Sequence, residues 1–231
     1  MFDNQAGHRK FARRGRTAGV AAAVGAALIA VGIGAFPAAG ADTGSANRSA
    51  TAPAAAPARP GLGSAGLLQS DDFFQQGLVP VRATVGLTGK QALSACSGEE
   101  TMRELTKGKA AAYAEVTWAF DTKGTSLTES AADGSTDTSA ASYKKQLDKL
   151  VRACQDEPQG HWYYGKGHAI TVKAGEGSWY PAFNGDGKVA GGVAVIRSGH
   201  RFGIVELTGQ PSDDPGYVEG IAAAAVNRLS H

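Results

Sequence analysis

The sequence predicts an α+β fold, in which an antiparallel β-sheet is covered by helices and one disulfide is present. Two segments repeat apolar residues at the helical period, and strand-like segments separated by glycine-bearing turns lie between and before them. No helix alternates strictly with these strands, as a parallel sheet would require. The strands are therefore expected to form meanders, with helices between and after them.

The clearest helical pattern runs from Ser139 to Cys154. Its apolar residues recur at helical spacing, so they form one face of the helix. Cys154 belongs to this face and is therefore expected to point into the core. These residues are Tyr143, Leu147, Leu150, Val151 and Cys154. Asp137 and Thr138 are candidate N-caps of this helix, and Pro158 and Gly160 close the segment.

A second helix is expected at the end of the chain. Asp214 followed by Pro215 matches a capping residue with proline at the first helical position. Beyond them the apolar residues lie on one side: Val218, Ile221, Ala222, Ala225 and Leu229. This side is expected to pack on the sheet.

Four strands are predicted between the two helices, at residues 169–173, 178–183, 193–197 and 202–207. Glycine-bearing turns are expected to separate them, at residues 175–177, 184–187 and 198–199.

Two further strands are predicted upstream of the first helix. Residues 113–120 alternate between an apolar and a mixed face, which is typical of a half-buried strand. Residues 121–124 then form a turn into a weaker partner strand at 125–131.

Residues 1–41 have the three parts of an export signal: a basic start, an uncharged run, and small residues for a peptidase at Ala39 and Ala41. The signal peptide is therefore expected to be removed, leaving a secreted protein or one in the extracellular cell envelope. The alternative is a membrane anchor, because the uncharged run from Ala18 to Phe36 approaches the length of a membrane span.

Residues 42–66 are rich in Ala and Pro and have almost no large apolar side chain, so a disordered linker is expected there.

Residues 67–231 are long enough for one domain with its own core. This domain carries 16 basic and 19 acidic side chains. Such a balance argues against a nucleic-acid-binding domain, which would be expected to show a basic stripe.

Cys96 and Cys154 are the two cysteines of the chain. In an exported domain such a pair predicts one disulfide. The chain-entropy model gives a loop of this length a stabilisation of roughly 4 kcal/mol at most. The alternative is a pair of reactive thiols, but the cysteines are far apart in sequence and Cys154 lies on a buried helical face.

One segment has binding character, because aromatic rings with polar tips suit a ligand groove or an interface. The candidate ligand-binding residues are His161, Trp162, Tyr163, Tyr164, His168, Trp179 and Tyr180. The alternative is that Trp162 and Trp179 fill the core while the tyrosines lie at its rim.

No catalytic residue, metal ligand or cofactor is predicted. The chain has no glycine-flanked serine of the G-x-S-x-G type, and the spacing of its histidines fits no zinc motif. His200, next to a hairpin turn, is expected to be solvated. Adjacent carboxylates do not face each other on a helix, so they are interpreted as caps and surface charge.

The order of these elements resembles a known family. The chain begins with a leader and an Ala/Pro-rich linker, followed by a short opening at 67–71, the first cysteine and a hairpin. A helix that ends with residues 150–154 comes next. A meander containing residues 195–199 and a closing helix follow. This organisation resembles the actinobacterial sensor-domain family, whose members have a PknH-like extracellular domain. The resemblance implies that this chain is a stand-alone secreted member. The family's domain has two disulfides, whereas this chain can form one.

The resemblance implies an antiparallel sheet flanked by helices, a polar cleft for an unidentified ligand, and no catalytic residues. We therefore expect an exported, non-catalytic sensor-like domain that binds a small ligand or a cell-envelope component. One alternative is a small cell-envelope hydrolase that uses His161 or His168 as base, which would need a hydroxyl and a carboxylate within reach. Another is a structural envelope protein that binds a partner surface.

Overall fold

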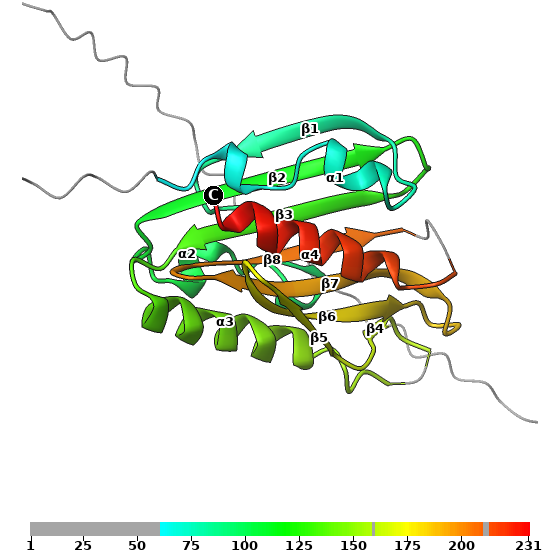
Figure 1. Cartoon of the computed structure of the whole chain (residues 1–231). Helices are drawn as coiled ribbons and strands as arrows, with labels where there is room; N and C mark the ends of the chain where they lie inside the picture. Colours follow the sequence, from blue (N-terminus) through cyan, green and yellow to red (C-terminus); the bar gives the residue numbers. More distant parts are fainter. Residues whose placement is uncertain (1–60, 159, 210–212) are drawn as a thin grey trace, which may run out of the picture. The chain divides into compact units, whose positions relative to one another are not determined.

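The structure, a computed structural model, describes residues 61–158, 160–209 and 213–231. The predicted signal peptide and most of the predicted linker lie outside the described residues. The predicted α+β class is confirmed by an antiparallel sheet of eight strands with helices packed on it (Figure 1). In the described part of the chain, no helix has both the length and the apolar character needed to cross a membrane.

The strand order across the sheet is β1-β2-β3-β8-β7-β6-β4, and β5 also pairs with β6. Every neighbouring pair is antiparallel. The strands are β1 (Pro80–Gly86), β2 (Ala112–Phe120), β3 (Ser126–Asp133), β4 (Tyr163–Tyr164), β5 (His168–Val172), β6 (Gly175–Phe183), β7 (Val189–Ser198) and β8 (Arg201–Thr208). The six predicted strands are confirmed as β2, β3 and β5 to β8, whereas β1 and β4 were not predicted.

In the described part of the chain, four α-helices accompany the sheet: α1 (Asp71–Phe74), α2 (Met102–Leu105), α3 (Asp137–Arg152) and α4 (Tyr217–Leu229). The two long helices, α3 and α4, cover opposite faces. On β7, Ala194 and Ile196 belong to the apolar core beneath α4, while Val193 and Val195 belong to the core beneath α3. This division follows from the alternation of side chains along a strand.

The predicted first helix is α3, with a different cap. The Thr136 hydroxyl accepts a hydrogen bond from the Ser139 backbone N–H, and the Thr136 backbone is extended, as expected for an N-cap. The predicted caps Asp137 and Thr138 therefore lie inside the helix. The predicted helical face is confirmed in α3 at Leu147, which is fully buried.

The predicted second helix is α4, which begins at Tyr217 after an N-cap at Gly216. Asp214 Oδ1 accepts a hydrogen bond of 2.9 Å from the Gly216 backbone N–H. Asp214 therefore closes a turn just before the helix instead of capping the helix itself.

The turn predicted at residues 175–177 was wrong, because these residues are the start of β6. Val172 pairs with Gly175, so the hairpin loop between β5 and β6 is Lys173 and Ala174. A β-carbon at Gly175 would collide with the backbone carbonyl of Arg197 on β7. The glycine thus permits close approach of two strands.

Candidate functional site

The predicted aromatic cluster is divided between the two faces of the sheet. Trp179 and Tyr180 are neighbours on β6, so their side chains point to opposite faces. Trp179 is buried in the core beneath α4, and Tyr180 is buried in the core beneath α3. His168 lies opposite Trp179 in the sheet and stacks on it, with ring centroids 4.5 Å apart.

Trp162 and Tyr164 belong to the core beneath α3. Their rings meet edge to face with centroids 4.6 Å apart, and Tyr164 is buried. The Tyr164 hydroxyl donates a hydrogen bond of 2.7 Å to Glu206 Oε1. Burial, followed by the nearby charge of Glu206, raises the pKa of the Tyr164 hydroxyl. Tyr164 is therefore a structural residue.

Tyr163 and His161 lie apart from the buried rings. Tyr163 stacks on Phe183, with centroids 5.3 Å apart, and lines a cavity of about 250 Å³ beside residues 185–187. His161 is exposed, and its Nδ1 lies 3.6 Å from Glu157 Oε2. The seven candidate residues therefore do not line one common site.

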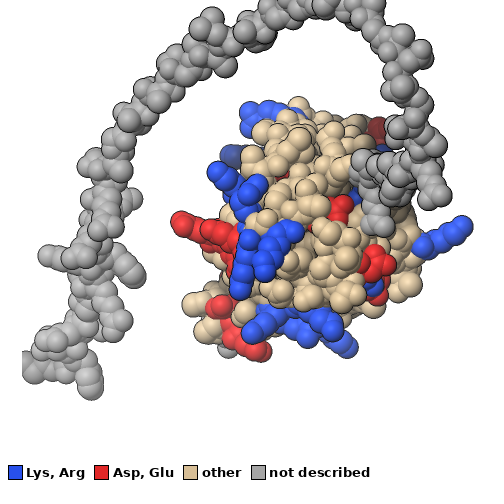
Figure 2. Space-filling view, turned by 90° about the vertical axis from the view of Figure 1, so that its left-hand side faces the viewer, with Lys and Arg blue, Asp and Glu red and all other residues tan. Residues whose placement is uncertain are grey.

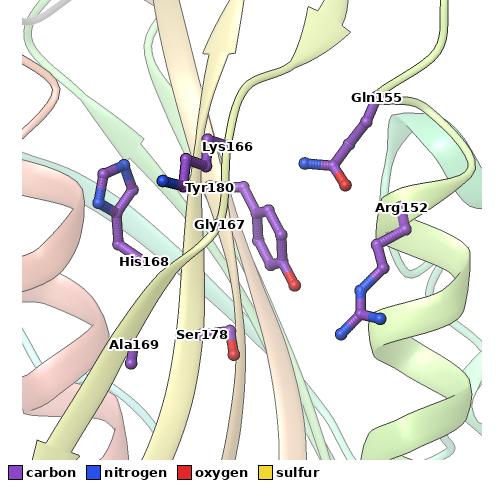
Figure 3. Close-up of a pocket in the computed structure, with 8 residues that line it drawn as sticks. All are labelled: Arg152, Gln155, Lys166, Gly167, His168, Ala169, Ser178 and Tyr180. Atoms are coloured by element: carbon purple, nitrogen blue, oxygen red, sulfur yellow. The ribbon is translucent and has the colours of Figure 1, made fainter.

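A larger cavity of about 400 Å³ lies between the C-terminal end of α3 and strands β5 and β6 (Figure 3). We call this cavity the α3–β5 pocket. Of the seven candidates it brings together His168 and Tyr180. Its full lining is Arg152, Gln155, Lys166, Gly167, His168, Ala169, Ser178 and Tyr180.

The polar groups of the α3–β5 pocket lie on two sides of the β5 backbone (Figure 3). On one side, the Tyr180 hydroxyl and the Arg152 guanidinium point toward each other, with Ser178 nearby. Hydrogen bonding with the Tyr180 side chain is the main cause that raises the pKa of Arg152. The His168 imidazole lies on the other side, where it stacks on Trp179.

Contacts with the end of α3 fix one wall of this pocket. Gln155 Nε2 donates a hydrogen bond of 2.6 Å to the Gly165 carbonyl, and the Tyr164 N–H donates one of 3.2 Å to the Cys154 carbonyl. The predicted disulfide between Cys96 and Cys154 is confirmed, with Cα atoms 5.9 Å apart. Because Gln155 follows Cys154 directly, the disulfide also anchors this wall.

Gly167 allows the loop before β5 to lie against the Tyr180 ring. A β-carbon at Gly167 would lie 2.6 Å from Tyr180 Cε1, closer than atoms in van der Waals contact. Any larger residue would therefore displace the loop or the ring and change the shape of the pocket.

The lining of the pocket is basic. Arg152 and Lys166 carry positive charge, and none of the eight lining residues is Asp or Glu. Asp148, one turn earlier on α3, contributes to the raised pKa of Arg152, but its Oδ2 accepts a hydrogen bond of 3.0 Å from Lys144. On the face drawn in Figure 2, by contrast, basic and acidic side chains are intermixed.

Arg152, Gln155 and Ser178 were not predicted as site residues, and Lys166, which follows the aromatic segment in the sequence, was not among the seven candidates. Arg152 and Gln155 follow the apolar face of a helix, and nothing in the sequence indicates that this helix end meets β6. Lys166 stands two residues before His168, and this proximity was the one available signal.

His161 has a carboxylate neighbour, Glu157, and His168 an aromatic one, Trp179. Among the described residues, the hydrogen bonds of the structure join neither histidine to a hydroxyl group. The expectation that His200 is solvated was wrong, because its side chain is only 25% exposed. The hairpin packs against the end of β3, which brings His200 Nε2 to 3.4 Å from Asp133 Oδ2.

Within the described ranges, no group of three or more His, Cys, Asp or Glu could hold a metal ion.

Comparisons with known proteins bear on the fold. No family model matches this sequence, and no curated protein matches it either. Among solved structures, the extracellular domain of PknH from Mycobacterium tuberculosis is similar, with a TM-score of 0.50 and 12% identity over 72% of this chain and 93% of that one. The resemblance predicted from the sequence is thus confirmed at the level of the fold, and the chain shares the fold of that extracellular domain.

Proposed function

We propose that this protein is an exported, non-catalytic sensor-like domain that binds a small anionic ligand, or an anionic group of a cell-envelope component, in the α3–β5 pocket. The observation that carries the proposal is the chemistry of this cavity. Its lining includes two basic side chains, Arg152 on the side of the Ser178 and Tyr180 hydroxyls and Lys166 on the side of His168, and none of its lining residues is acidic (Figure 3).

The arrangement suits a carboxylate or a phosphate. An arginine guanidinium can donate two parallel hydrogen bonds to such a group, and hydrogen bonds to charged groups are the stronger ones. The Tyr180 hydroxyl and the Arg152 guanidinium point toward each other, so both can donate to one bound anion (Figure 3). The volume, about 400 Å³, is within the range of small-molecule sites.

Two features support a location outside the cytoplasm. The chain contains a disulfide, which persists in oxidising compartments, and it shares its fold with an extracellular domain. We propose that the exported form begins at Asp42, after the small residues Ala39 and Ala41. Sequencing the amino terminus of protein recovered from the culture medium tests this, and recovery of Met1 from membranes alone would indicate an anchor.

The binding proposal is tested by titrating the full chain with glucuronate, a sugar carboxylate, and with inorganic phosphate, using neutral glucose as a control. The ¹⁵N–¹H signals of Gly167 and Ala169 report on the pocket. We expect the anions to shift these signals and glucose to leave them in place. The effect should weaken with added salt, because Arg152 is exposed and its charge is screened.

Matched variants locate the site. Arg152→Gln and Lys166→Gln should each weaken anion binding about tenfold, equivalent to about 1.4 kcal/mol. Lys188→Gln, in the exposed turn before β7 and outside the pocket lining, should leave it unchanged. Equal losses in all three variants, or binding insensitive to them, would remove the pocket as the site.

A further inference from the structure

The large hydrophobic side chains exposed on the described part of the chain are concentrated in one short stretch. They are Phe74, Val79, Val81, Val85 and Leu87, and their exposed fractions range from 45% to 62%. Val81 and Val85 lie on β1, Val79 and Leu87 flank this strand, and Phe74 is the last residue of α1. Apolar side chains gathered in this way mark interaction surfaces more often than scattered ones do.

The strand that carries these residues is an edge strand. β1 pairs with β2 on one side, and the described residues supply no strand on its other side (Figure 1). A free edge presents unpaired backbone N–H and C=O groups, and proteins usually protect such edges with charges or very short strands. The opposite edge of the sheet is formed by two shorter strands that both pair with β6, β4 with two residues and β5 with five, whereas β1 has seven residues and one charged side chain, Arg82.

The sequence of β1 is complementary to itself in the antiparallel direction. From Val81 to Val85 it reads Val-Arg-Ala-Thr-Val, so a two-fold axis at Ala83 places Val81 opposite Val85 of the second copy. The register between β1 and β2 shifts at Val81, between Pro80 and Arg82, so the regular part of β1 around this axis is residues 82–86. The same register places Arg82 opposite Thr84, so the charge of Arg82 does not face its own copy. Pairs of β-branched side chains directly opposite each other stabilise a sheet, and like charges there destabilise it.

The register with β2 shows which face such a pairing would extend. Val85 lies opposite Val116, and Ala83 lies opposite Trp118. Val116 belongs to the core beneath α4, and Trp118 packs against it. Pairing of two β1 strands would therefore cover apolar side chains that continue the core face of the sheet.

We propose that β1 is a self-association edge, at which a second copy of this chain pairs antiparallel about Ala83 and joins the two sheets. The strand is short, so the pairing buries less than a standard protein–protein interface of roughly 1,600 Å². We therefore expect a weak, concentration-dependent dimer.

The test is sedimentation velocity of the full chain from about 10 µM to 1 mM, with Ala83 replaced by Glu or by Lys. Ala83 is exposed, so neither charge should disturb the fold, and circular dichroism checks this. Each variant alone places like charges opposite each other at the axis, and we expect its dissociation constant to rise at least tenfold. An equimolar mixture of Ala83→Glu and Ala83→Lys should recover dimers, because opposite charges then meet.

Thr171→Lys, an exposed position on β5, is the matched control and should dimerise like the unchanged chain. A chain that stays monomeric at 1 mM would overturn the proposal, as would dimers that persist in both Ala83 variants or a mixture that fails to recover them. Association driven by residues 1–60 would not respond to the charge at Ala83. Binding of the monomeric chain to lipid vesicles through the β1 residues would instead assign this surface to a membrane.

Discussion

The side chain of Glu129, in the middle of β3, accepts a hydrogen bond of 2.7 Å from the backbone N–H of Leu68, which lies 61 residues earlier in the chain. Glu129 is fully buried, and its neighbours on the adjacent strands, Val116 and Val205, belong to the core beneath α4. A second contact ties this segment to the domain: Asp72 forms an ion pair with Arg228 on α4, at 2.9 Å. The opening segment buries Leu67, Leu68 and Phe73 in the core, and one buried carboxyl group and one partly buried ion pair hold it in addition.

The first prediction follows from the protonation of Glu129. Burial raises the pKa of this carboxyl group from 4.5 to about 8. Between these two pH values the folded state keeps a proton that the unfolded state releases, so the free energy of unfolding falls as pH rises through this window. The loss is at most about 5 kcal/mol, from the pKa difference alone.

Urea titrations at pH 5, 6.5 and 8.5 measure this dependence. Glu129→Gln carries no titrating group there, so its free energy of unfolding should change less with pH than that of the unchanged chain. Glu99→Gln, at an exposed position, should retain the full dependence. Identical pH profiles for the unchanged chain and Glu129→Gln would show that Glu129 is ionised throughout.

The second prediction concerns the disulfide between Cys96 and Cys154. Replacing both cysteines by Ala should lower the free energy of unfolding by about 2 to 4 kcal/mol, because the unfolded chain regains a long loop. Alkylation without reduction should label neither thiol in the unchanged protein. Labelling of both in folded exported protein would contradict the bond.

The third prediction separates two leucines on α3. Leu147→Ala should cost about 2 to 5 kcal/mol, because Leu147 is fully buried and the change leaves a cavity. Leu150→Ala should cost less, because Leu150 is only partly buried. Lys145→Ala, on the exposed side of the helix, should change stability little. Guanidinium titrations measure all three, and equal losses would mean that the buried face of α3 is misassigned.

The fourth prediction distinguishes two tyrosines by role. Tyr164→Phe removes the buried hydrogen bond to Glu206, so it should lower the free energy of unfolding by about 1 to 3 kcal/mol without altering the α3–β5 pocket. Tyr180→Phe removes a hydroxyl that meets Arg152 in the pocket, so it should weaken glucuronate binding with near-native melting. Calorimetry and the anion titration together report both effects. The reverse pattern would place the site at Tyr164.

Several features of this protein are local in origin, and the sequence by itself determined them. Alternation along residues 113–120 marks β2 because successive side chains of a strand point to opposite faces, although the structure buries residues on both faces of β2 and not on one as the half-buried pattern predicted. The spacing of Leu147 and Val151 marks α3 because a helix repeats every 3.6 residues. The cysteines could be paired because the chain has two of them. β1 gave no such signal, since most of its residues are exposed and little burial imposes a pattern.

Only the tertiary structure decided which residues meet at the candidate site. Trp179 and Tyr180 are adjacent in sequence but lie on opposite faces of β6, whereas Arg152 and Tyr180 are distant in sequence and point toward each other. Their meeting depends on how α3 packs across β7 and β8 and on the loop that Gln155 holds against the helix end. Such contacts arise from the burial of whole faces, which residue spacing along one element does not encode.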